Sequence, residues 1–415
     1  MNPIALSVSA AHEATPATVP AKVRLASLDA YRGLAMLLMA SGLLHLPETA
    51  AHFPDSKVWQ VIGFHWEHVL WSGCSLHDLI QPSFSFMVGV ALPFSIASRR
   101  SLDQSGAMLW AHVLWRALVL VMLGVALRSM GRRMTYWTFE DTLSQIGLGY
   151  PLLFAVACCG ARAPWWALGL ILAGYWTAFA VYPFPPADFN WEQFKGQAWF
   201  PAFQAHWNQN SNAAWAFDRW FLNLFPRESV FFGNEGGYST LSFIPTLGTM
   251  LLGLIAGRWL KNDPPAGEEE FFDPRPMRVV GRIIAAGLVC LALGWGLDQL
   301  GWCPSVKRIW TPSWTLLSGG WCFLAMAAFY LLADVWGLKR WFFPLTVVGM
   351  NSIAMYVLVD GAGSFIGETL HTHFGTRPFG IFGLAWAPLF HGAAVLIICW
   401  LIMLWMHRRK LYLRV

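Results

Sequence analysis

The sequence has few charged residues. Asp, Glu, Lys and Arg make up 12% of its 415 residues, whereas 56% of the residues are hydrophobic. Globular soluble domains carry about 25% charged residues, and a chain this apolar cannot bury its hydrophobic surface in one water-surrounded core. The composition therefore indicates an integral membrane protein.

Several other features are missing. The seven cysteines are scattered without a CxxC pair or metal-ligand spacing, so the sequence indicates neither a disulfide framework nor a zinc knuckle. The formal charge of +5 comes from short basic clusters between apolar runs, which argues against nucleic acid as a partner. Residues 1–21 lack a basic start and an apolar core of signal-peptide length, and we predict a disordered tail.

Long apolar runs recur along the rest of the chain. They predict a single all-α polytopic membrane domain over residues 22–415, with about ten transmembrane helices. Ser27 is the expected N-cap of the first helix, and Asp29 and Arg32 are expected to pair in its first turns. The expected helices cover 28–46, 77–98, 108–128, 142–160, 164–182, 239–260, 279–297, 313–333, 343–361 and 380–405.

The distribution of basic residues predicts the topology. Lys and Arg are more frequent on one set of connections, including Arg99, Arg100, Lys339 and Arg340, although Arg132 and Arg133 lie on the other set. The positive-inside rule then places both termini in the cytoplasm. Two long connections follow from this topology: an extracytoplasmic aromatic loop at about 183–238, expected to pack as a lid, and a charged, proline-rich cytoplasmic linker at about 261–278.

The stretch from Gly63 to Arg100 contains the main candidate site. It places His65, Glu67, His68, His77 and Asp78 at the mouth of an apolar run. Titratable groups beside a membrane span need a partner or water, so such a cluster is a functional-site hypothesis by default. The mouth should face the extracytoplasmic side.

His68 and Asp78 are the candidate catalytic residues. Imidazole can accept a proton from an amine or take an acyl group, whereas the alternative is an interfacial histidine that only hydrogen-bonds a neighbour. Asp78 closes an S-x-x-D capping box with Ser75, and a capping carboxylate could also orient an imidazole. His65 and His68 form an H-x-x-H pair, but the weak pattern leads us to expect no metal.

Four further residues are candidates for a substrate path. Gln81 and Ser83 follow Asp78 in the same helix, and Asn351 lies in the stretch GMNSIAMY. Lys307, with Arg308, precedes a helix start and could bind an anion. Interhelical hydrogen bonds or basic interface anchors would explain the same residues.

Several sequence blocks taken together resemble the heparan-α-glucosaminide N-acetyltransferase family of multi-pass membrane acyltransferases and its bacterial branch. The matching blocks are RLASLDAYRGLAMLLM, HVLWSGCSLHDLIQPSFSFMVGV, LSQIGLGY, STLSFIPTLGTMLLGLIAG, KRIWTPSWTLLSGG and FPLTVVGMNSIAMYV. They cover most of the predicted helices in the family's order.

The resemblance implies an enzyme that moves an acetyl group from acetyl-CoA, as co-substrate, to an amino sugar across the membrane. The family's active histidine falls at His68 and its partner aspartate at Asp78. Whether His68 carries the acetyl group or acts as a general base does not follow from the sequence. Arg99, Arg100, Arg258 and Arg282 are candidates for the CoA phosphates, on charge and side alone.

The chain also departs from the family pattern. Leu43 stands near a position where the family commonly has asparagine, Gln81 stands where an apolar residue is usual, and the 183–238 loop has no matching counterpart. These departures leave the acceptor open between an amino sugar and another glycan. A membrane transporter or permease for a sugar or organic anion is the alternative function. We expect a bacterial inner-membrane location, with the oligomeric state open between monomer and homo-oligomer.

Overall fold

The structure is a computed structural model that describes residues 25–102, 104–263 and 274–413. The predicted tail over residues 1–21 and most of the predicted 261–278 linker lie outside these ranges. The described residues form helices and loops, with two isolated β-bridges, Ser72 with Val306 and Gln197 with Gln209, and no strands. The predicted all-α fold class is therefore confirmed.

Fourteen α-helices follow one another in the described ranges. They are α1 Ala26–Ala40, α2 Leu46–Ala51, α3 Lys57–Trp66, α4 Ile80–Arg100, α5 Gly106–Ser129, α6 Thr142–Cys158, α7 Ala163–Ala180, α8 Ala213–Phe221, α9 Phe243–Asn262, α10 Arg275–Gln299, α11 Pro312–Phe329, α12 Phe343–Gly349, α13 Ser352–Phe374 and α14 Ala387–Arg408. Short 3₁₀ turns include η1 Ser41–Leu44, η2 His77–Leu79 and η5 Thr240–Ser242, and a π-helical turn, Tyr330–Val335, extends α11.

Seven helical segments in the described part of the chain are long and apolar enough to cross a membrane. They are His77–Arg100, Gly106–Ser129, Thr240–Asn262, Arg275–Gln299, Pro312–Val335, Ser352–Phe374 and Leu384–Arg408. The predicted helices at 28–46, 142–160 and 164–182 correspond to α1, α6 and α7, which fall short of these limits. The protein is thus a polytopic membrane protein, and ten crossings stay a prediction.

One predicted helix is wrong. The sequence suggested a continuous helix over 343–361, but the chain breaks at Met350 and Asn351, between α12 and α13. Asn351 has φ −127° and ψ 37°, outside helical values, and its side-chain amide binds the backbone near the C-terminus. The hydropathy pattern indicates only a continuous apolar run. It carries no information on this break, because the break is stabilised by backbone groups about 60 residues away in the sequence.

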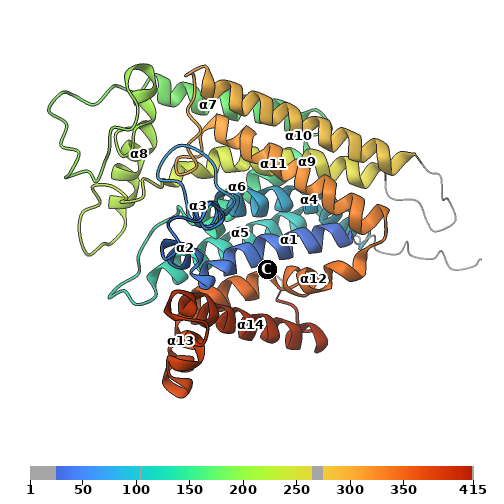
Figure 1. Ribbon diagram of the computed structural model, residues 1–415. Helices are drawn as coiled ribbons and strands as arrows, with labels where there is room; N and C mark the ends of the chain where they lie inside the picture. The colour runs from blue at the N-terminus through green and yellow to red at the C-terminus, as the bar shows by residue number, and fades with distance from the viewer. Residues whose placement is uncertain (1–24, 103, 264–273, 414–415) are drawn as a thin grey trace, which may run out of the picture.

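Glycines allow α4 and α9 to pack closely at the centre of the bundle (Figure 1). A side chain at Gly253 would collide with the Phe86 carbonyl oxygen, and one at Gly257 with the Val90 carbonyl oxygen. Gly89 of α4 faces the α9 backbone at Met250 in the same way. Small residues spaced as G-x-x-x-G let helix backbones approach in membranes, where packing replaces the hydrophobic effect as the driving force.

The described beginning and end of the chain lie near the same end of the bundle. Gly349 packs against the backbone of Asp29, early in α1, and Asn351 binds the backbone of Leu411 and Leu413. The N-terminus of α1 is capped by Asp334, whose carboxylate accepts from the backbone of Ala26 and Ser27 at 3.0 Å each. Ser27 itself therefore lies inside α1, and its predicted N-cap role is wrong.

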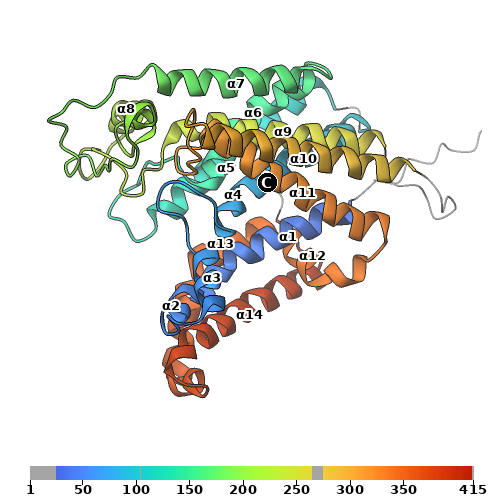
Figure 2. The ribbon, with the colours of Figure 1, turned by 45° about the horizontal axis from the view of Figure 1, so that its top comes forward.

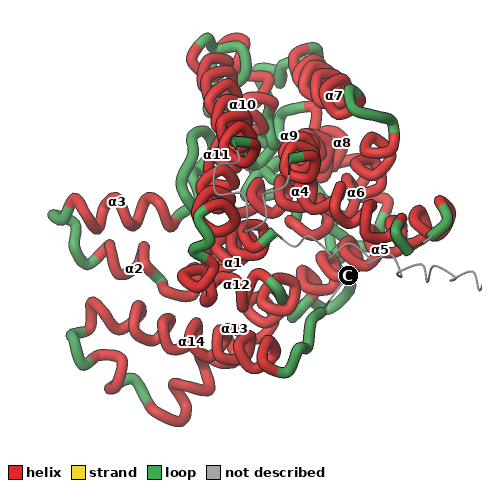
Figure 3. Tube along the Cα trace, turned by 90° about the vertical axis from the view of Figure 1, so that its right-hand side faces the viewer, coloured by secondary structure: helices red, strands yellow, loops and turns green. Residues whose placement is uncertain are grey.

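The opposite end of the bundle carries loop 67–76, loop 300–311 and the aromatic loop with α8 (Figures 1 and 2). We call this the site end. The aromatic loop packs against α7, where Phe179 stacks on Trp207 with ring centroids 6.4 Å apart. Viewed along the bundle, α2 and α3 project from the side above α13 and α14 (Figure 3). The loop that carries His68 therefore shares one end of the bundle with the long aromatic loop.

Candidate active site

Two loops far apart in sequence come together at the site end. Loop 67–76 and loop 300–311 are joined by the bridge between Ser72 and Val306, in which the Gly73 amide donates to the Ser305 carbonyl at 3.1 Å. The Arg308 guanidinium also donates to the Val69 carbonyl at 3.3 Å. These backbone contacts fix the first loop, which carries His68, against the second, which carries Lys307.

The predicted capping box forms. The Asp78 carboxylate accepts from the Ser75 amide at 3.0 Å, and the Ser75 hydroxyl lies 3.3 Å from the Asp78 amide, which donates to it. The same carboxylate oxygen, Oδ2, lies 3.3 Å from the Val69 amide. Capping thus occupies one oxygen of Asp78 and leaves the other oxygen for different partners.

The second oxygen of Asp78 binds the two charged or titratable groups of the loops. His68 Nδ1 lies 2.9 Å from Asp78 Oδ1, and Lys307 Nζ lies 3.0 Å from the same atom. Lys307 Nζ is also 3.1 Å from His68 Nδ1. The Asp78 side chain is fully buried, Lys307 is 6% exposed and His68 is 41% exposed. The three form a compact group with only the imidazole reaching the surface.

The partners of His68 determine which ring nitrogen is available. An ionised carboxylate only accepts hydrogen bonds, so the 2.9 Å contact with Asp78 favours a proton on Nδ1. The Lys307 ammonium only donates, so with Nδ1 protonated its 3.1 Å approach to that nitrogen is a close contact and not a hydrogen bond, and Lys307 donates to Asp78 instead. The neutral ring then has its lone pair on Nε2, which is free to take a proton or attack a carbonyl. Lys307 supplies the positive charge that offsets the buried Asp78 carboxylate. The arrangement thus provides an oriented base or nucleophile at the protein surface.

Other titratable groups surround this site without joining it. The ring of His77 lies 4.8 Å from that of His68, and His65 Nδ1 accepts from the Leu76 amide at 3.3 Å. Burial, reinforced by the nearby Asp78 charge, raises the pKa of the Cys74 thiol to about 12, so this thiol is protonated at neutral pH and is a poor nucleophile. Within the described ranges, no three His, Cys, Asp or Glu side chains are grouped as metal ligands would be.

Gln81 and Ser83 lie on the first turns of α4, on the side of Asp78 that faces the interior of the bundle. The Gln81 amide donates to Gln145 of α6 at 3.1 Å. Ser83 is buried, donates to the Leu79 carbonyl at 2.7 Å and lies 2.9 Å from the Tyr31 hydroxyl of α1. Both residues thus make interhelical contacts next to the site, and their place on a substrate path stays a prediction.

The four arginines proposed for CoA lie at the other end of the bundle. Arg99 and Arg100 end α4, whose 21 residues place them about 30 Å from its start. Arg99 lies 2.6 Å from His112, and Arg282 pairs with Asp263 at 3.0 Å. Arg258 donates to the carbonyl of Ala157 in the last turn of α6 and to those of Gly160 and Ala161, which follow that helix. Arg100 is exposed.

Asn351 lies away from the His68 loops. Its amide donates to the Leu411 carbonyl at 2.9 Å, and its oxygen accepts from the Leu413 amide at 3.1 Å. The side chain is fully buried and holds the last described residues against the α12–α13 break. This is a structural role, and the predicted place of Asn351 on a substrate path stays a prediction.

Sequence reasoning recognised Lys307 but not its partners. It placed Lys307 on a substrate path, whereas the structure adds a direct contact with both His68 and Asp78. The basic pair before a helix start was the available signal, but 229 residues separate Lys307 from Asp78, and no local pattern spans that distance. Gln145 was missed because 64 residues separate it from Gln81, from which it accepts a hydrogen bond.

The fold and the site together define a class: a polytopic α-helical membrane protein with an imidazole, a buried carboxylate and a buried lysine at one end. No family model matches the chain. It is, however, 24% identical over 376 residues to heparan-alpha-glucosaminide N-acetyltransferase of Homo sapiens, a match that covers 80% of this chain and 52% of that protein. The Mus musculus protein of the same name is 22% identical, with 80% of this chain and 53% of the relative covered.

The resemblance drawn from the sequence blocks is therefore confirmed as a distant similarity. The chain spans about half the length of the curated relatives that it matches. The relatives' name and the apolar helices agree with an integral membrane protein related to N-acetyltransferases.

Proposed function

We propose that this protein is a transmembrane acetyltransferase that moves an acetyl group from acetyl-CoA to an amino sugar or glycan acceptor on the extracytoplasmic side of the membrane, in the bacterial inner membrane. The observation that carries the proposal is the contact of His68 with Asp78 at 2.9 Å, in a loop held at the site end. The distant similarity to N-acetyltransferases supports it.

His68 has two ways to act on the acceptor. As a general base, its Nε2 takes the proton of the acceptor amine while the nitrogen attacks the thioester carbonyl, and it then returns the proton to the departing thiolate. As a nucleophile, Nε2 attacks the carbonyl first, and the C–S bond breaks to release the CoA thiolate. The acceptor amine then takes the acetyl group from the ring and gives its proton to the thiolate or to water. Both routes need the Nε2 lone pair that the Asp78 contact provides.

Asp78 and Lys307 act through His68. Positive charge develops on the imidazole when Nε2 takes a proton or an acyl group, and the adjacent carboxylate stabilises that charge. Lys307 holds the carboxylate in place at 3.0 Å and prevents an isolated charge from being buried. We assign both as positioning residues. Ser83 and Gln81 are proposed to line the acceptor or acyl path directly below them.

The donor is proposed to approach from the opposite end of the bundle. Basic side chains are the usual partners of phosphate groups, and Arg99, Arg100 and Arg282 offer donors there. Arg282 is half exposed, with a side-chain exposure of 52%, whereas Arg258 already donates three hydrogen bonds to carbonyls in the last turn of α6 and in the turn that follows it. We therefore favour Arg99, Arg100 and Arg282 over Arg258 for the CoA phosphates.

A transporter is the second candidate function. The buried polar contacts of Gln81, Gln145 and Thr246 lie within the bundle, where polar groups often mark a solute path. A transporter would move a sugar or organic anion without covalent change, so it would need neither the thioester nor a free Nε2.

The test is acetyl transfer by the purified protein. Radiolabelled acetyl-CoA is supplied with a panel of amino sugars and glycans, and the wild type is compared with His68→Ala. Label in a sugar product that disappears in the variant is the expected result. If no product is labelled and acetyl-CoA is neither bound nor hydrolysed, the enzyme proposal fails and transport becomes the better one.

A further inference from the structure

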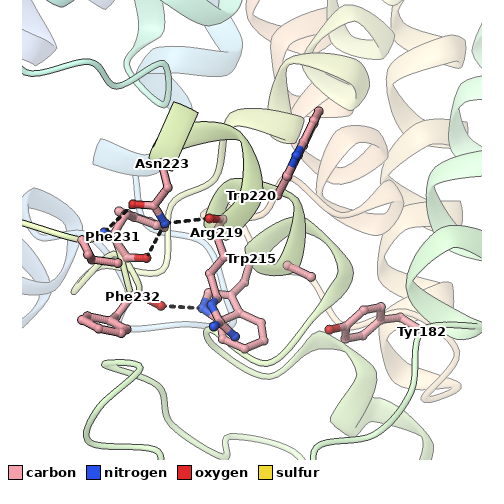
Figure 4. Close-up of a pocket in the computed structure, with 9 residues that line it drawn as sticks. Tyr182, Trp215, Arg219, Trp220, Asn223, Phe231 and Phe232 are labelled. Atoms are coloured by element: carbon pink, nitrogen blue, oxygen red, sulfur yellow. Dashed lines mark hydrogen bonds between the residues drawn. The ribbon is translucent and has the colours of Figure 1, made fainter. Parts of the chain in front are cut away.

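A cavity of about 290 Å³ lies beside α8 in the aromatic loop (Figure 4). It is separate from the loops that carry His68 and Lys307. Its walls include Tyr182, Trp215, Arg219, Trp220, Asn223 and Phe232. The cavity therefore combines aromatic side chains with one cation.

Arg219 is held in the cavity by aromatic rings. Its guanidinium carbon lies 4.8 Å from the Phe194 ring centroid and 4.9 Å from that of Trp215. The residue is exposed, and in the described ranges no carboxylate lies within ion-pair distance of it. Stacking fixes the plane of the guanidinium and leaves its N–H groups available to an anion.

The other polar side chains of the cavity are already engaged. The Asn223 amide donates to the Arg219 and Phe231 carbonyls and accepts from the Phe231 amide. The Trp215 indole donates to the Phe232 carbonyl at 2.8 Å. A sugar normally requires several side-chain hydrogen bonds, whereas this cavity offers a single cation, with the Tyr182 hydroxyl directed toward it (Figure 4). The cavity therefore suits an apolar ligand with one anionic group better than it suits a sugar.

The position of the cavity suggests the source of such a ligand. Tyr182 follows the end of α7 by two residues, at the point where that apolar helix meets the loop. Apolar side chains are exposed around it, among them Val181 at 73%, Trp220 at 62% and Val230 at 62%. Exposed Trp and Tyr side chains at the end of an apolar helix mark the headgroup level of a bilayer.

We propose that this cavity binds the phosphate of an anionic phospholipid, with Arg219 paired to the phosphate and the glycerol and first acyl carbons against Trp220 and Phe232. The bound lipid would fix the aromatic loop to the outer leaflet. The inference is independent of the proposed acetyl transfer, because it uses neither His68 nor Asp78.

The test measures lipid retention. The full-length protein is reconstituted in nanodiscs of equal phosphatidylcholine and phosphatidylglycerol, released, and its bound lipids are counted by native mass spectrometry. Arg219→Gln should retain roughly fivefold less phosphatidylglycerol, the effect of one surface cation. Arg219→Lys should retain most of it. Arg132→Gln is the matched control, because Arg132 also stacks on a ring, that of Tyr136 at 4.3 Å, but lies outside the cavity.

Three results would overturn the proposal. Equal retention by wild type and Arg219→Gln would show that the cavity does not select the lipid. Competition by soluble glycerol 3-phosphate at the same concentration as the lipid would point to a free phosphate site. Displacement of the lipid by a glucuronate disaccharide would make the cavity a glycan site.

Discussion

Two buried carboxylates at the same end of the bundle have opposite surroundings. Asp78 has no exposed surface and Asp218 of α8 is 2% exposed. Asp78 is met by Lys307, His68 and the Ser75 capping box. In the described ranges Asp218 accepts one hydrogen bond, from the Thr240 amide at 2.9 Å, and its Oδ1 has no partner.

The partners decide the charge of each group. Burial raises the pKa of Asp218 to about 7, and the Thr240 hydrogen bond offsets this only in part. Asp218 is therefore largely protonated below neutral pH and belongs to the packing of the aromatic loop. Asp78 is ion-paired with Lys307 and can support charge on His68. Two equally buried carboxylates thus differ because only Asp78 has a cation and an imidazole beside it.

The largest effect should come from removing the imidazole. His68→Ala is expected to lower acetyl transfer by roughly 10²–10⁴-fold, because general acid–base catalysis contributes about that much. The measurement is the initial rate of product formation at saturating acetyl-CoA. His65→Ala, at the end of α3 and three residues before His68, is the matched control and should keep the rate within about tenfold, since its ring contacts the Leu76 amide and the Phe64 ring but not Asp78. Comparable losses in both variants would mean that the loop as a whole, and not Nε2, is needed.

The second largest effect should come from removing one charge of the ion pair between Asp78 and Lys307. Asp78→Asn leaves Lys307 buried without a counter-charge, which should reduce the free energy of unfolding by about 3–5 kcal/mol. Asp78→Asn combined with Lys307→Met removes both charges, so it should recover much of the stability but no activity. Thermal unfolding followed by intrinsic tryptophan fluorescence compares the single and double variants. Strictly additive losses would contradict the coupling of the pair.

The third effect is a pH dependence from Asp218. Its pKa is about 7 in the folded protein and 3.8 ordinarily, so between about pH 4 and 7 the unfolded chain binds fewer protons than the folded one. Stability should be fully present at low pH and fall as pH rises through this interval. Asp218→Asn should flatten the decline of Tm between pH 5 and 8. Asp188→Asn, an exposed aspartate in the same loop, should leave it unchanged. A wild-type decline that persists in Asp218→Asn would assign the pH dependence to another group.

Local patterns in the sequence predict part of this comparison. The capping box of Ser75 and Asp78 spans four residues and is visible in the sequence, and so is the apolar run that follows it. The ion pair of Asp78 with Lys307 spans 229 residues, and the burial of Asp218 depends on the fold of a long loop. The α12–α13 break at Asn351 and the cap that Asp334 gives to α1 were missed for the same reason, since both depend on contacts more than 50 residues apart. Patterns within one helix turn were visible, and contacts made by the tertiary fold were not.

The smallest expected effect concerns Arg282, which lies at the end of the bundle opposite the site end. We call this the far end. The ion pair of Arg282 with Asp263 is exposed, so Arg282→Gln should change the free energy of unfolding by about 0–1 kcal/mol. If Arg282 binds a CoA phosphate, the same variant should raise the KM for acetyl-CoA roughly fivefold and leave kcat unchanged, because the lost contact is made equally in the ground and transition states. Lys339→Gln, an exposed cation on another connection of the far end, is the control and should leave both constants unchanged. An unchanged KM in Arg282→Gln would leave Arg282 as a membrane-side anchor, and donor recognition would then have to be sought at Arg99 and Arg100.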